Sequence, residues 1–212
     1  MTNTNLSLPF GIPSKIVCVG RNYADHAKEL GNEVPIQPLL FLKAPSALIG
    51  NNEAIVLPPQ SSRVEHEAEL GIIIGRDCKS LSDTEDPFQY IHGYVCVNDV
   101  TARDVQKTDI QFTRGKSFDT FCPVGSNVAI DLDVSDLEIT ARVNGKIKQV
   151  GSTSQMIFDI PYLMRYISNQ MTLKKGDLIA TGTPSGVSQL NLGDICEIEI
   201  EGIGILRNTI TK

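Results

Sequence analysis

The feature that most constrains the fold of this chain is a regular alternation of apolar and polar residues near its C-terminal end. Residues 193–206 (GDICEIEIEGIGIL) alternate with a period of two, which predicts one long half-buried strand. Asn144-Gly145 lies between two alternating runs in 139–149, and this dipeptide is a strong signal for a β-hairpin. Together these patterns predict a sheet with one buried face.

The rest of the chain contains more predicted strands than predicted helices. The apolar segments that we predict to be strands are 15–20, 39–43, 63–75 and 91–99. The predicted helices are 21–30, a helix that begins near Thr101 in a sequence resembling a capping box, and 157–168. Gly31-Asn32 is a normal stop signal for the first of them. Because strands dominate, the predicted fold class is α+β, mainly β.

The domain organisation follows from length and composition. No shift in composition marks a boundary, and 212 residues suit one domain. We therefore expect a short N-terminal lead, 1–14, followed by a single domain, 15–212. The lead lacks the charged and apolar regions of a signal peptide, and no apolar run approaches the roughly 20 residues needed to span a bilayer.

Charge and cysteine usage exclude several classes of partner and site. The formal net charge is −6 and the pI is about 5.1, which argues against binding to nucleic acid or to an anionic membrane. The five cysteines are widely spaced and form no CxxC motif, which argues against a disulfide framework or a zinc site. We therefore expect a protein of the reducing cytoplasm.

A row of glutamates in 63–75 (RVEHEAELGIIIG) is the first candidate site. Glu65, Glu67 and Glu69 alternate, so they would share one face of a strand at a spacing of about 7 Å. Neighbouring carboxylates repel each other, and a divalent cation would remove that cost. The alternative is an edge strand whose acidic face lies in water. His66 would point to the opposite face, where a packed histidine is a better interpretation than a metal ligand.

Asp99 favours the metal-site interpretation, because it ends the predicted strand 91–99 directly before a helix. Strand ends that open into loops are where proteins of this class place chemistry. A site of carboxylates without a histidine or cysteine cluster is a hard oxygen site. It favours Mg²⁺, Mn²⁺ or Ca²⁺ over Zn²⁺.

A second candidate is the pair His26 and Glu29 in the predicted helix 21–30. Residues three apart lie near each other on a helix surface. A carboxylate beside an imidazole orients the ring and raises its basicity, as a general base acting on water requires. The alternative is a solvated pair on a surface helix.

Further polar residues at strand ends, helix faces or turns could be site residues or ordinary surface: Lys43, Arg103, Gln106, Lys116 and Thr183.

Six ordered stretches give the chain a specific resemblance to a known family. They are CVGRNYADHAKE, PLLFLKAPSAL, EHEAELGIIIG, GYVCVNDVTARD, GKSFDTFCP and LIATGTPSGV. From about Lys15 to the C-terminus, the chain resembles the fumarylacetoacetate hydrolase family, and within it the short members of the acylpyruvase and oxaloacetate decarboxylase type. The resemblance implies a mixed β-sandwich or β-roll of the kind found in that family's C-terminal domain, a single catalytic domain, and a homodimer.

The resemblance also implies roles for individual residues. The ligands of Mg²⁺, or of Mn²⁺ or Ca²⁺, would be Glu67, Glu69 and Asp99, whereas Glu65 falls outside the matching pattern. The catalytic residues would be His26 and Glu29, on a lid-like helix, together with Lys116, which would polarise the substrate. The residues implied to bind the substrate are Arg21, Lys43, Arg103, Gln106 and Thr183.

The activity that the resemblance implies is metal-dependent hydrolysis of a carbon–carbon bond in an acylpyruvate such as acetylpyruvate or fumarylpyruvate. The substrate would be a small dicarboxylate or β-keto acid, and the products pyruvate and a carboxylic acid. Oxaloacetate decarboxylation and keto–enol tautomerisation (an isomerase) are alternatives that use the same enolate. Hydrolysis is preferred because simple decarboxylation does not need a water-activating pair. A more distant alternative is a metal-binding protein without turnover.

Overall fold

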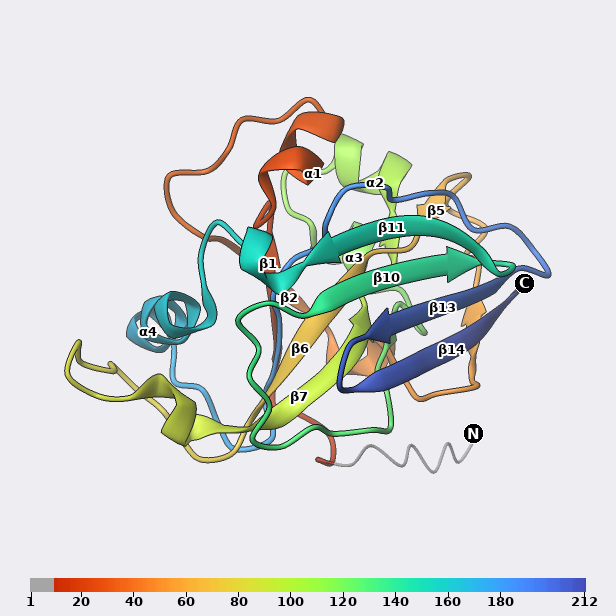
Figure 1. Ribbon diagram of the computed structural model, residues 1–212. Helices are drawn as coiled ribbons and strands as arrows, with labels where there is room; N and C mark the ends of the chain where they lie inside the picture. The colour runs from red at the N-terminus through yellow and green to blue at the C-terminus, as the bar shows by residue number, and fades with distance from the viewer. Residues whose placement is uncertain (1–9) are drawn as a thin grey trace.

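The computed structural model describes residues 10–212, which form two five-stranded sheets packed face to face (Figure 1). The strands of the first sheet, in spatial order, are β2 (Leu39–Lys43), β1 (Ile16–Gly20), β12 (Leu178–Ala180), β6 (Ala68–Ile74) and β7 (Ile91–Asn98). Those of the second are β11 (Lys146–Ser152), β10 (Glu138–Val143), β13 (Ile195–Ile200), β14 (Gly204–Thr211) and β4 (Ala54–Val56).

Short elements join and cover these sheets. Two small ladders pair β3 (Leu48–Ile49) with β9 (Cys122–Pro123), and β5 (Val64–Glu65) with β8 (Thr101–Ala102). The α-helices are α1 (Ala24–Glu29), α2 (Arg103–Thr108), α3 (Thr113–Lys116) and α4 (Ile160–Gln170). The 3₁₀-helices are η1 (Pro45–Ala47), η2 (Pro87–Tyr90) and η3 (Thr153–Gln155). The fold is therefore α+β and mainly β, as predicted.

The sheets are mixed, and their facing sides form the core. Most neighbouring strands are antiparallel, but β1 pairs with β12 and β14 pairs with β4 in parallel. All seven residues of β6 are buried, because this strand lies inside the first sheet and is covered on both faces. In contrast, β13 alternates between buried and half-buried residues, as its period-two sequence predicts.

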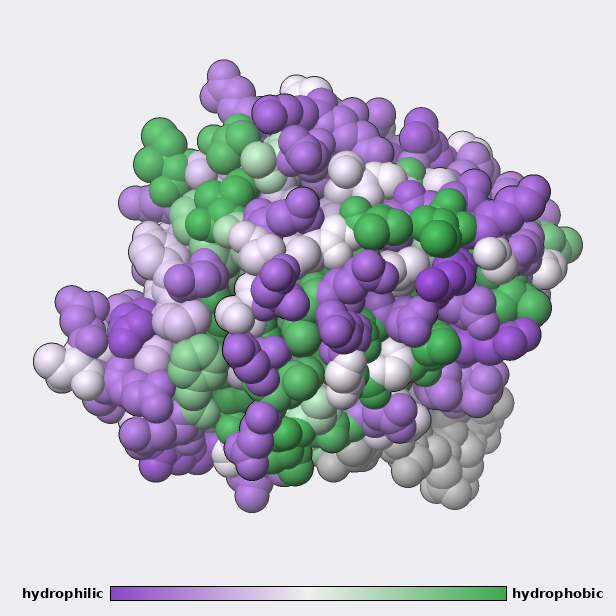
Figure 2. Space-filling model, viewed as in Figure 1, coloured by the Kyte–Doolittle hydropathy of each residue, from purple (hydrophilic) through white to green (hydrophobic). Residues whose placement is uncertain are grey.

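The second sheet keeps one face at the surface. Figure 2 shows this face as a mixture of hydrophilic residues and smaller hydrophobic patches. The exposed hydrophobic side chains of this sheet include Ile147 and Val150 in β11 and Ile205 in β14. None of the helices in residues 10–212 has both the length and the hydrophobicity needed to cross a membrane.

Three sequence predictions about elements need correction. Residues 193–206 do not form one strand, because the chain turns at 201–203 and pairs β13 with β14. The apolar positions change phase at this turn, from Ile198 and Ile200 to Ile203 and Ile205, and Gly202 between them has a φ of +75°. The prediction of one strand did not use this break. The predicted strand 63–75 is interrupted between β5 and β6. The predicted capping box is absent, since α2 begins at Arg103 and its N-cap is Ala102.

Other predictions are confirmed. Asn144-Gly145 joins β10 to β11, with φ angles of 53° and 73° that suit a tight hairpin turn. Helix α1 ends before Gly31, whose φ of +70° is the left-handed conformation expected after a helix. The predicted lead, 1–14, lies mostly outside the described residues. Helices α1 and α2 lie at the same end of the two sheets (Figure 1), and this end carries the candidate site.

Candidate active site

A cavity of about 280 Å³ opens at this end of the molecule. Its wall includes all of the predicted site residues except Glu29 and Lys43. Those that line it are Arg21, His26, Glu67, Glu69, Asp99, Arg103, Gln106, Lys116 and Thr183. The fold therefore brings together residues from both halves of the first sheet and from three helices.

Three carboxylates form the floor of the cavity because β6 and β7 pair side by side. Ala68 lies opposite Asn98 in this ladder, and the Asp99 amide donates to the Glu67 carbonyl at 2.9 Å. Carboxylate oxygens of Glu67, Glu69 and Asp99 all lie within 4.8 Å of one another. All three residues are buried. The alternative of an acidic strand face in water is therefore wrong.

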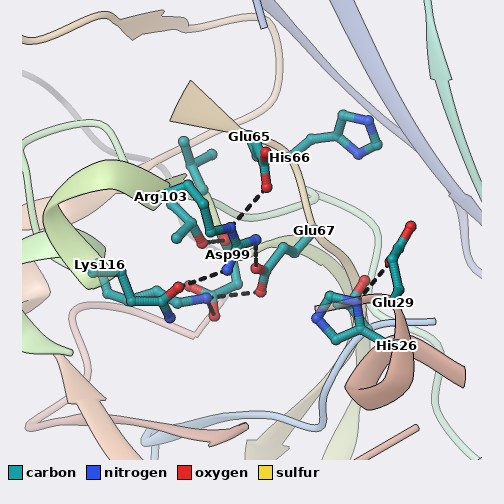
Figure 3. Close-up of polar contacts among 12 residues, drawn as sticks. His26, Glu29, Glu65, His66, Glu67, Asp99, Arg103 and Lys116 are labelled. Atoms are coloured by element: carbon teal, nitrogen blue, oxygen red, sulfur yellow. Dashed lines mark hydrogen bonds and ion pairs between the residues drawn. The ribbon is translucent and has the colours of Figure 1, made fainter. Parts of the chain in front are cut away.

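Positively charged side chains compensate two of these carboxylates. The Lys116 ammonium lies 2.7 Å from Glu67 Oε2 and 2.6 Å from Asp99 Oδ2 (Figure 3). Arg103 Nη2 donates to Glu67 Oε1. Burial alone would raise the pKa of Glu67, but Lys116 and Arg103 outweigh it and lower that pKa below its usual range. Burial disfavours a charged lysine, yet Asp99 and Glu67 raise the pKa of Lys116 above its ordinary value.

Glu69 has a different environment. Within residues 10–212 no basic side chain pairs with it, and its hydrogen bond comes from the Gly182 amide at 2.8 Å. Burial, followed by the charges of Asp99 and Glu67, raises the pKa of Glu69 well above its ordinary value. The raised pKa favours the neutral, protonated form of Glu69, and a cation held beside it would favour the carboxylate.

This donor set fits a hard divalent cation. Three buried carboxylates supply oxygen ligands without sulfur or imidazole, which suits Mg²⁺, Mn²⁺ or Ca²⁺. All three side chains line the cavity, so an ion held by them would be within reach of a substrate. We conclude that Glu67, Glu69 and Asp99 could hold such an ion, as predicted.

Glu65, which the sequence left without a role, holds Arg103. The Glu65 side chain is only 1% exposed, and its Oε2 accepts from Arg103 Nε at 2.7 Å. Arg103 Nη1 donates to Gln106 Oε1 at 2.6 Å. With its contact to Glu67, the guanidinium is fixed at all three nitrogens. The outer oxygen of Glu65 accepts from Arg63 Nε at 2.6 Å.

Lys43 lies behind the cavity rather than in its wall. Its side chain is fully buried, and its ammonium pairs with Asp99 Oδ1 at 2.5 Å and donates to the Val100 carbonyl at 3.1 Å. The prediction that Lys43 binds the substrate therefore needs correction. Lys43 instead holds the Asp99 carboxylate in place through this ion pair.

The predicted pair His26 and Glu29 is formed on α1. His26 Nδ1 lies 3.1 Å from Glu29 Oε2, and the His26 side chain is 5% exposed whereas that of Glu29 is 32% exposed. The Gly186 amide donates to both oxygens of Glu29, at 3.0 and 3.2 Å. Because Glu29 accepts from Nδ1, Nε2 is the nitrogen left for the cavity. Figure 3 places this pair next to Glu67.

His66 points away from the carboxylates (Figure 3) and is fully buried, as predicted for a packed histidine. Burial lowers its pKa to about 4, so the ring is neutral at pH 7.

The sequence missed several cavity residues. Phe41 and Phe112 form an edge-to-face pair with centroids 5.5 Å apart, and Lys107 and Asn32 also line the wall. Phe41 was within reach of sequence reasoning, because it precedes Lys43 by two residues on the same strand. Asn32 follows α1, Lys107 lies on α2 and Phe112 is the N-cap residue of α3. Their residue types gave no reason to place them at the cavity.

Comparison with known proteins adds independent findings. Residues 15–211 match the family model described as fumarylacetoacetate (FAA) hydrolase C-terminal. The mitochondrial oxaloacetate decarboxylase of Dictyostelium discoideum is 45% identical over 196 residues, which are 89% of this chain and 89% of that protein. Oxaloacetate tautomerase YisK of Bacillus subtilis is 41% identical over 224 residues, covering 99% of this chain and 74% of the relative.

A solved structure agrees with the fold. The crystal structure of 2-hydroxyhepta-2,4-diene-1,7-dioate isomerase from Mycobacterium marinum superimposes with a TM-score of 0.87 at 47% identity. The match covers 94% of this chain and 75% of that chain. The named activities of these three proteins are decarboxylation, tautomerisation and isomerisation.

Proposed function

Since this chain belongs to the fumarylacetoacetate hydrolase C-terminal domain family, we propose that it is an enzyme that enolises a small β-keto acid, with oxaloacetate as the first candidate substrate. The observation that carries the proposal is one cavity lined by both a histidine base and a cluster of three carboxylates. The names of the decarboxylase and tautomerase relatives support the choice of oxaloacetate.

His26 is the proposed base. Its Nε2 faces the cavity, and Glu29 holds the ring through Nδ1. In the conversion of keto form to enol, Nε2 would take a proton from the carbon between the two carbonyl carbons, and the imidazolium would give a proton to the former keto oxygen. The reverse reaction would move the protons back. Glu29 would stabilise the imidazolium that forms in between. Tautomerisation would use the His26–Glu29 pair in both proton transfers. Decarboxylation of oxaloacetate would use the pair only afterwards, to protonate the enolate that remains when CO₂ has left.

The cationic side chains are proposed to bind the anionic substrate. Lys116 and Arg103 line the cavity and keep their charge, because the pKa of each is raised. Arg21 and Lys107 line it too, and within the described part of the chain neither forms an ion pair. Arg21 also has a φ of +58°, an uncommon backbone conformation for a residue other than glycine. These two residues are available for a substrate carboxylate.

Glu67, Glu69 and Asp99 are the proposed ligands of a divalent cation, Mg²⁺ in the first instance and Mn²⁺ or Ca²⁺ otherwise. When bound, such an ion acts as a Lewis acid that favours negative charge on a carbonyl oxygen of the substrate. The chain's own contribution is to exclude bulk water from these buried carboxylates. It also sets them beside the His26 ring, and Lys43 holds Asp99 from behind.

Hydrolysis of acylpyruvates is the second candidate. The observation that favours it is the His26–Glu29 contact, because an oriented imidazole can deprotonate a water molecule that attacks a carbonyl carbon. Cleavage would then yield pyruvate and a carboxylic acid. No named relative described above carries this activity, so we place it second.

A parallel assay decides between these reactions. The purified protein is given Mg²⁺ or Mn²⁺ and oxaloacetate, acetylpyruvate or fumarylpyruvate, while enol absorbance, CO₂ release and pyruvate formation are followed. We expect metal-dependent loss of enol-oxaloacetate absorbance to be the fastest reaction. Faster cleavage of an acylpyruvate would select hydrolysis. No metal-dependent turnover of any substrate would leave a metal-binding protein without catalysis.

A further inference from the structure

The turn at 181–186 (TGTPSG) contacts both halves of the site. The Gly182 amide donates to Glu69 Oε2 at 2.8 Å, on the carboxylate side. The Gly186 amide donates to both Glu29 oxygens, at 3.0 and 3.2 Å, on the side of the histidine. The position of this turn therefore sets the position of two acidic side chains that the proposed reaction uses.

Gln149 reaches this turn from the opposite sheet. It lies on β11, at the edge of the second sheet, and is the one fully buried residue of that strand. The register with β10 shifts next to it, because Ala141 pairs with Gln149 whereas Arg142 pairs with Ile147. Such a bulge changes the direction in which a side chain points. Here it lies next to Gln149, whose polar side chain points into the protein.

Every hydrogen-bonding position of the Gln149 carboxamide has a partner. Nε2 donates to Thr183 Oγ1 at 2.8 Å and to the Pro184 carbonyl at 2.7 Å, both within the 181–186 turn. Oε1 accepts from the Ala68 amide at 3.0 Å and lies 3.0 Å from His66 Nδ1. A buried amide with both donors and both acceptor positions filled is held in one orientation.

The hydrogen bonds of His66 fix its tautomer and complete the network. Gln149 Oε1 is an acceptor, so His66 Nδ1 carries the proton. Ser188 Oγ then donates to His66 Nε2 at 2.9 Å. The chain of donors therefore runs from Ser188 through His66 to Gln149, and the Gln149 amide group donates onward to the 181–186 turn.

The turn also packs tightly on β11. A Cβ atom on Gly186 would lie 2.1 Å from the Lys148 carbonyl oxygen, and Gly186 has a φ of +99°. One on Gly151 would lie 2.5 Å from Pro184 Cβ. The contact leaves no space for the turn to approach β11 further. The hydrogen bonds of Gln149 oppose movement in the other direction, away from the strand.

We propose that Gln149 is a positioning residue that acts through Glu29. By holding the 181–186 turn against β11, it keeps the Gly186 amide on Glu29, and Glu29 thereby keeps the His26 ring aimed at the cavity. This inference rests on the proposed function of His26 and Glu29. It adds a residue of the second sheet to a site otherwise built from the first sheet and its helices.

The test is a double-mutant cycle between Gln149→Met and Glu29→Gln, with Gln170→Met on the exposed end of α4 as the matched control. We expect Gln149→Met to lower kcat by about tenfold or more, since small displacements of catalytic groups have effects of this size. The Gly182 end of the turn stays anchored, because the amide and the hydroxyl of Thr181 both donate to the Leu70 carbonyl. KM and Mn²⁺ affinity should therefore change by less than about threefold. In the Glu29→Gln background, the same substitution should change kcat by less than about twofold. An equal loss in both backgrounds would overturn the proposal.

A second readout separates this proposal from the proposed function. The chain has three histidines, so the His26 ring Cε1–H resonance can be assigned by substitution. We expect Gln149→Met to shift this resonance in the otherwise unchanged protein but not in the Glu29→Gln background, whether or not any substrate is turned over. If the unchanged protein is inactive but this pattern holds, the proposed function fails and the positioning role stands.

Gln149→Glu covers the case in which Gln149→Met does not fold. It keeps the acceptor that faces Ala68 and His66 but loses both donors to the turn, so it should reproduce the kcat loss and the resonance shift. If neither variant folds, Gln149 is a determinant of folding and the proposal is overturned.

Discussion

Glu65, Glu67 and Glu69 come from one alternating row of residues, yet each has different surroundings. Glu65 holds Arg103, Glu67 faces Arg103 and Lys116, and Glu69 has a backbone amide as its hydrogen-bond donor. Their spacing in the sequence is the same, so the pattern could not separate them. The differences arise from Arg103, Lys116 and Gly182, which the fold brings back beside the row.

Glu69→Gln tests whether Glu69, which has no basic partner among residues 10–212, is a metal ligand. We expect divalent-ion affinity to fall by about 100-fold or more, since even outer partners of metal ligands contribute 10- to 100-fold. The metal-free variant should unfold at a higher temperature than the unchanged protein at pH 7, because the raised pKa of Glu69 marks an ionised form that burial disfavours. Mn²⁺ titration and thermal unfolding with chelator measure the two effects. Unchanged affinity would remove Glu69 from the ligand set.

Glu65→Gln tests the anchor of Arg103. The neutral amide would hold the Arg103 guanidinium less firmly, so we expect KM for oxaloacetate to rise by about tenfold while Mn²⁺ affinity stays the same. Steady-state kinetics measure this split. Arg63→Gln is the control, because Arg63 contacts the other oxygen of Glu65 with a side chain that is 55% exposed. A KM equal to that of the unchanged protein would mean that Arg103 does not need Glu65.

At the scale of elements, most strands followed from the sequence and most of their ends did not. Apolar runs and the Asn144-Gly145 turn located the strands, because strand periodicity and turn chemistry are local. The break of 193–206 into two strands coincides with a change of phase in the alternation at Glu201-Gly202, which the prediction of one strand did not use. The missing capping box depends on Thr101, whose hydroxyl donates to the Asp99 carbonyl instead of capping α2.

The candidate site also contains residues that the sequence could predict and residues that only the fold reveals. Residue spacing marked the carboxylates and the His26–Glu29 pair as candidates but left a solvated surface open for each. The six ordered family motifs favoured the site interpretation. The sequence could not identify Gln149, Gly182 or Gly186. Gln149 contributes a side chain from a distant edge strand, and Gly182 and Gly186 contribute backbone amides. Neither a distant contact nor a backbone amide produces a recognisable pattern of residue types. The position of Lys43 behind Asp99 likewise depends on depth within the fold.

Gly186→Ala tests the packing of the 181–186 turn on β11. Gly193→Ala is the matched control, because Gly193 also has a positive φ, +87°, but a Cβ atom there meets nothing within 4 Å. The control should lose only about 1–2 kcal/mol of unfolding free energy from backbone strain. Gly186→Ala should lose clearly more and should also lower kcat, as urea unfolding and kinetics would measure. Equal losses in both variants would show that the turn can move away from β11 freely.

At the scale of the whole molecule, the two sheets contribute unequally to the site. The first sheet supplies the carboxylates and the second supplies the side chain that supports the 181–186 turn. The exposed face of the second sheet carries hydrophobic patches among its hydrophilic residues (Figure 2). The homodimer that the family resemblance implies stays a prediction.

Global stability should depend on Asp177, which joins the start of β1 to the turn before β12. Its carboxylate accepts from Ser14, Lys15 and the Lys174 amide. Burial alone would raise the pKa of Asp177, but its bonds from Lys15 and Ser14 outweigh burial and lower it. A carboxylate with a lowered folded-state pKa stabilises the protein above its unfolded pKa, and that stability is lost as pH falls through the folded value.

We therefore expect Asp177→Asn to lower the unfolding free energy at pH 7 by about 2 kcal/mol, the scale of hydrogen bonds to a charged group. The difference from the unchanged protein should shrink below about pH 4, near the ordinary pKa of an aspartate. Urea unfolding at several pH values measures both. A difference that is constant from pH 7 to pH 3 would contradict an electrostatic role for Asp177.

The most direct test of the central claim is to measure oxaloacetate turnover and Mn²⁺ binding together in the His26→Ala variant. Metal binding and proton transfer belong, in this proposal, to different residues that share one cavity. We therefore expect His26→Ala to lower kcat by about 100-fold or more, the scale of general acid–base catalysis, while Mn²⁺ affinity matches that of the unchanged protein. Full turnover by the variant, or loss of Mn²⁺ binding together with turnover, would contradict it.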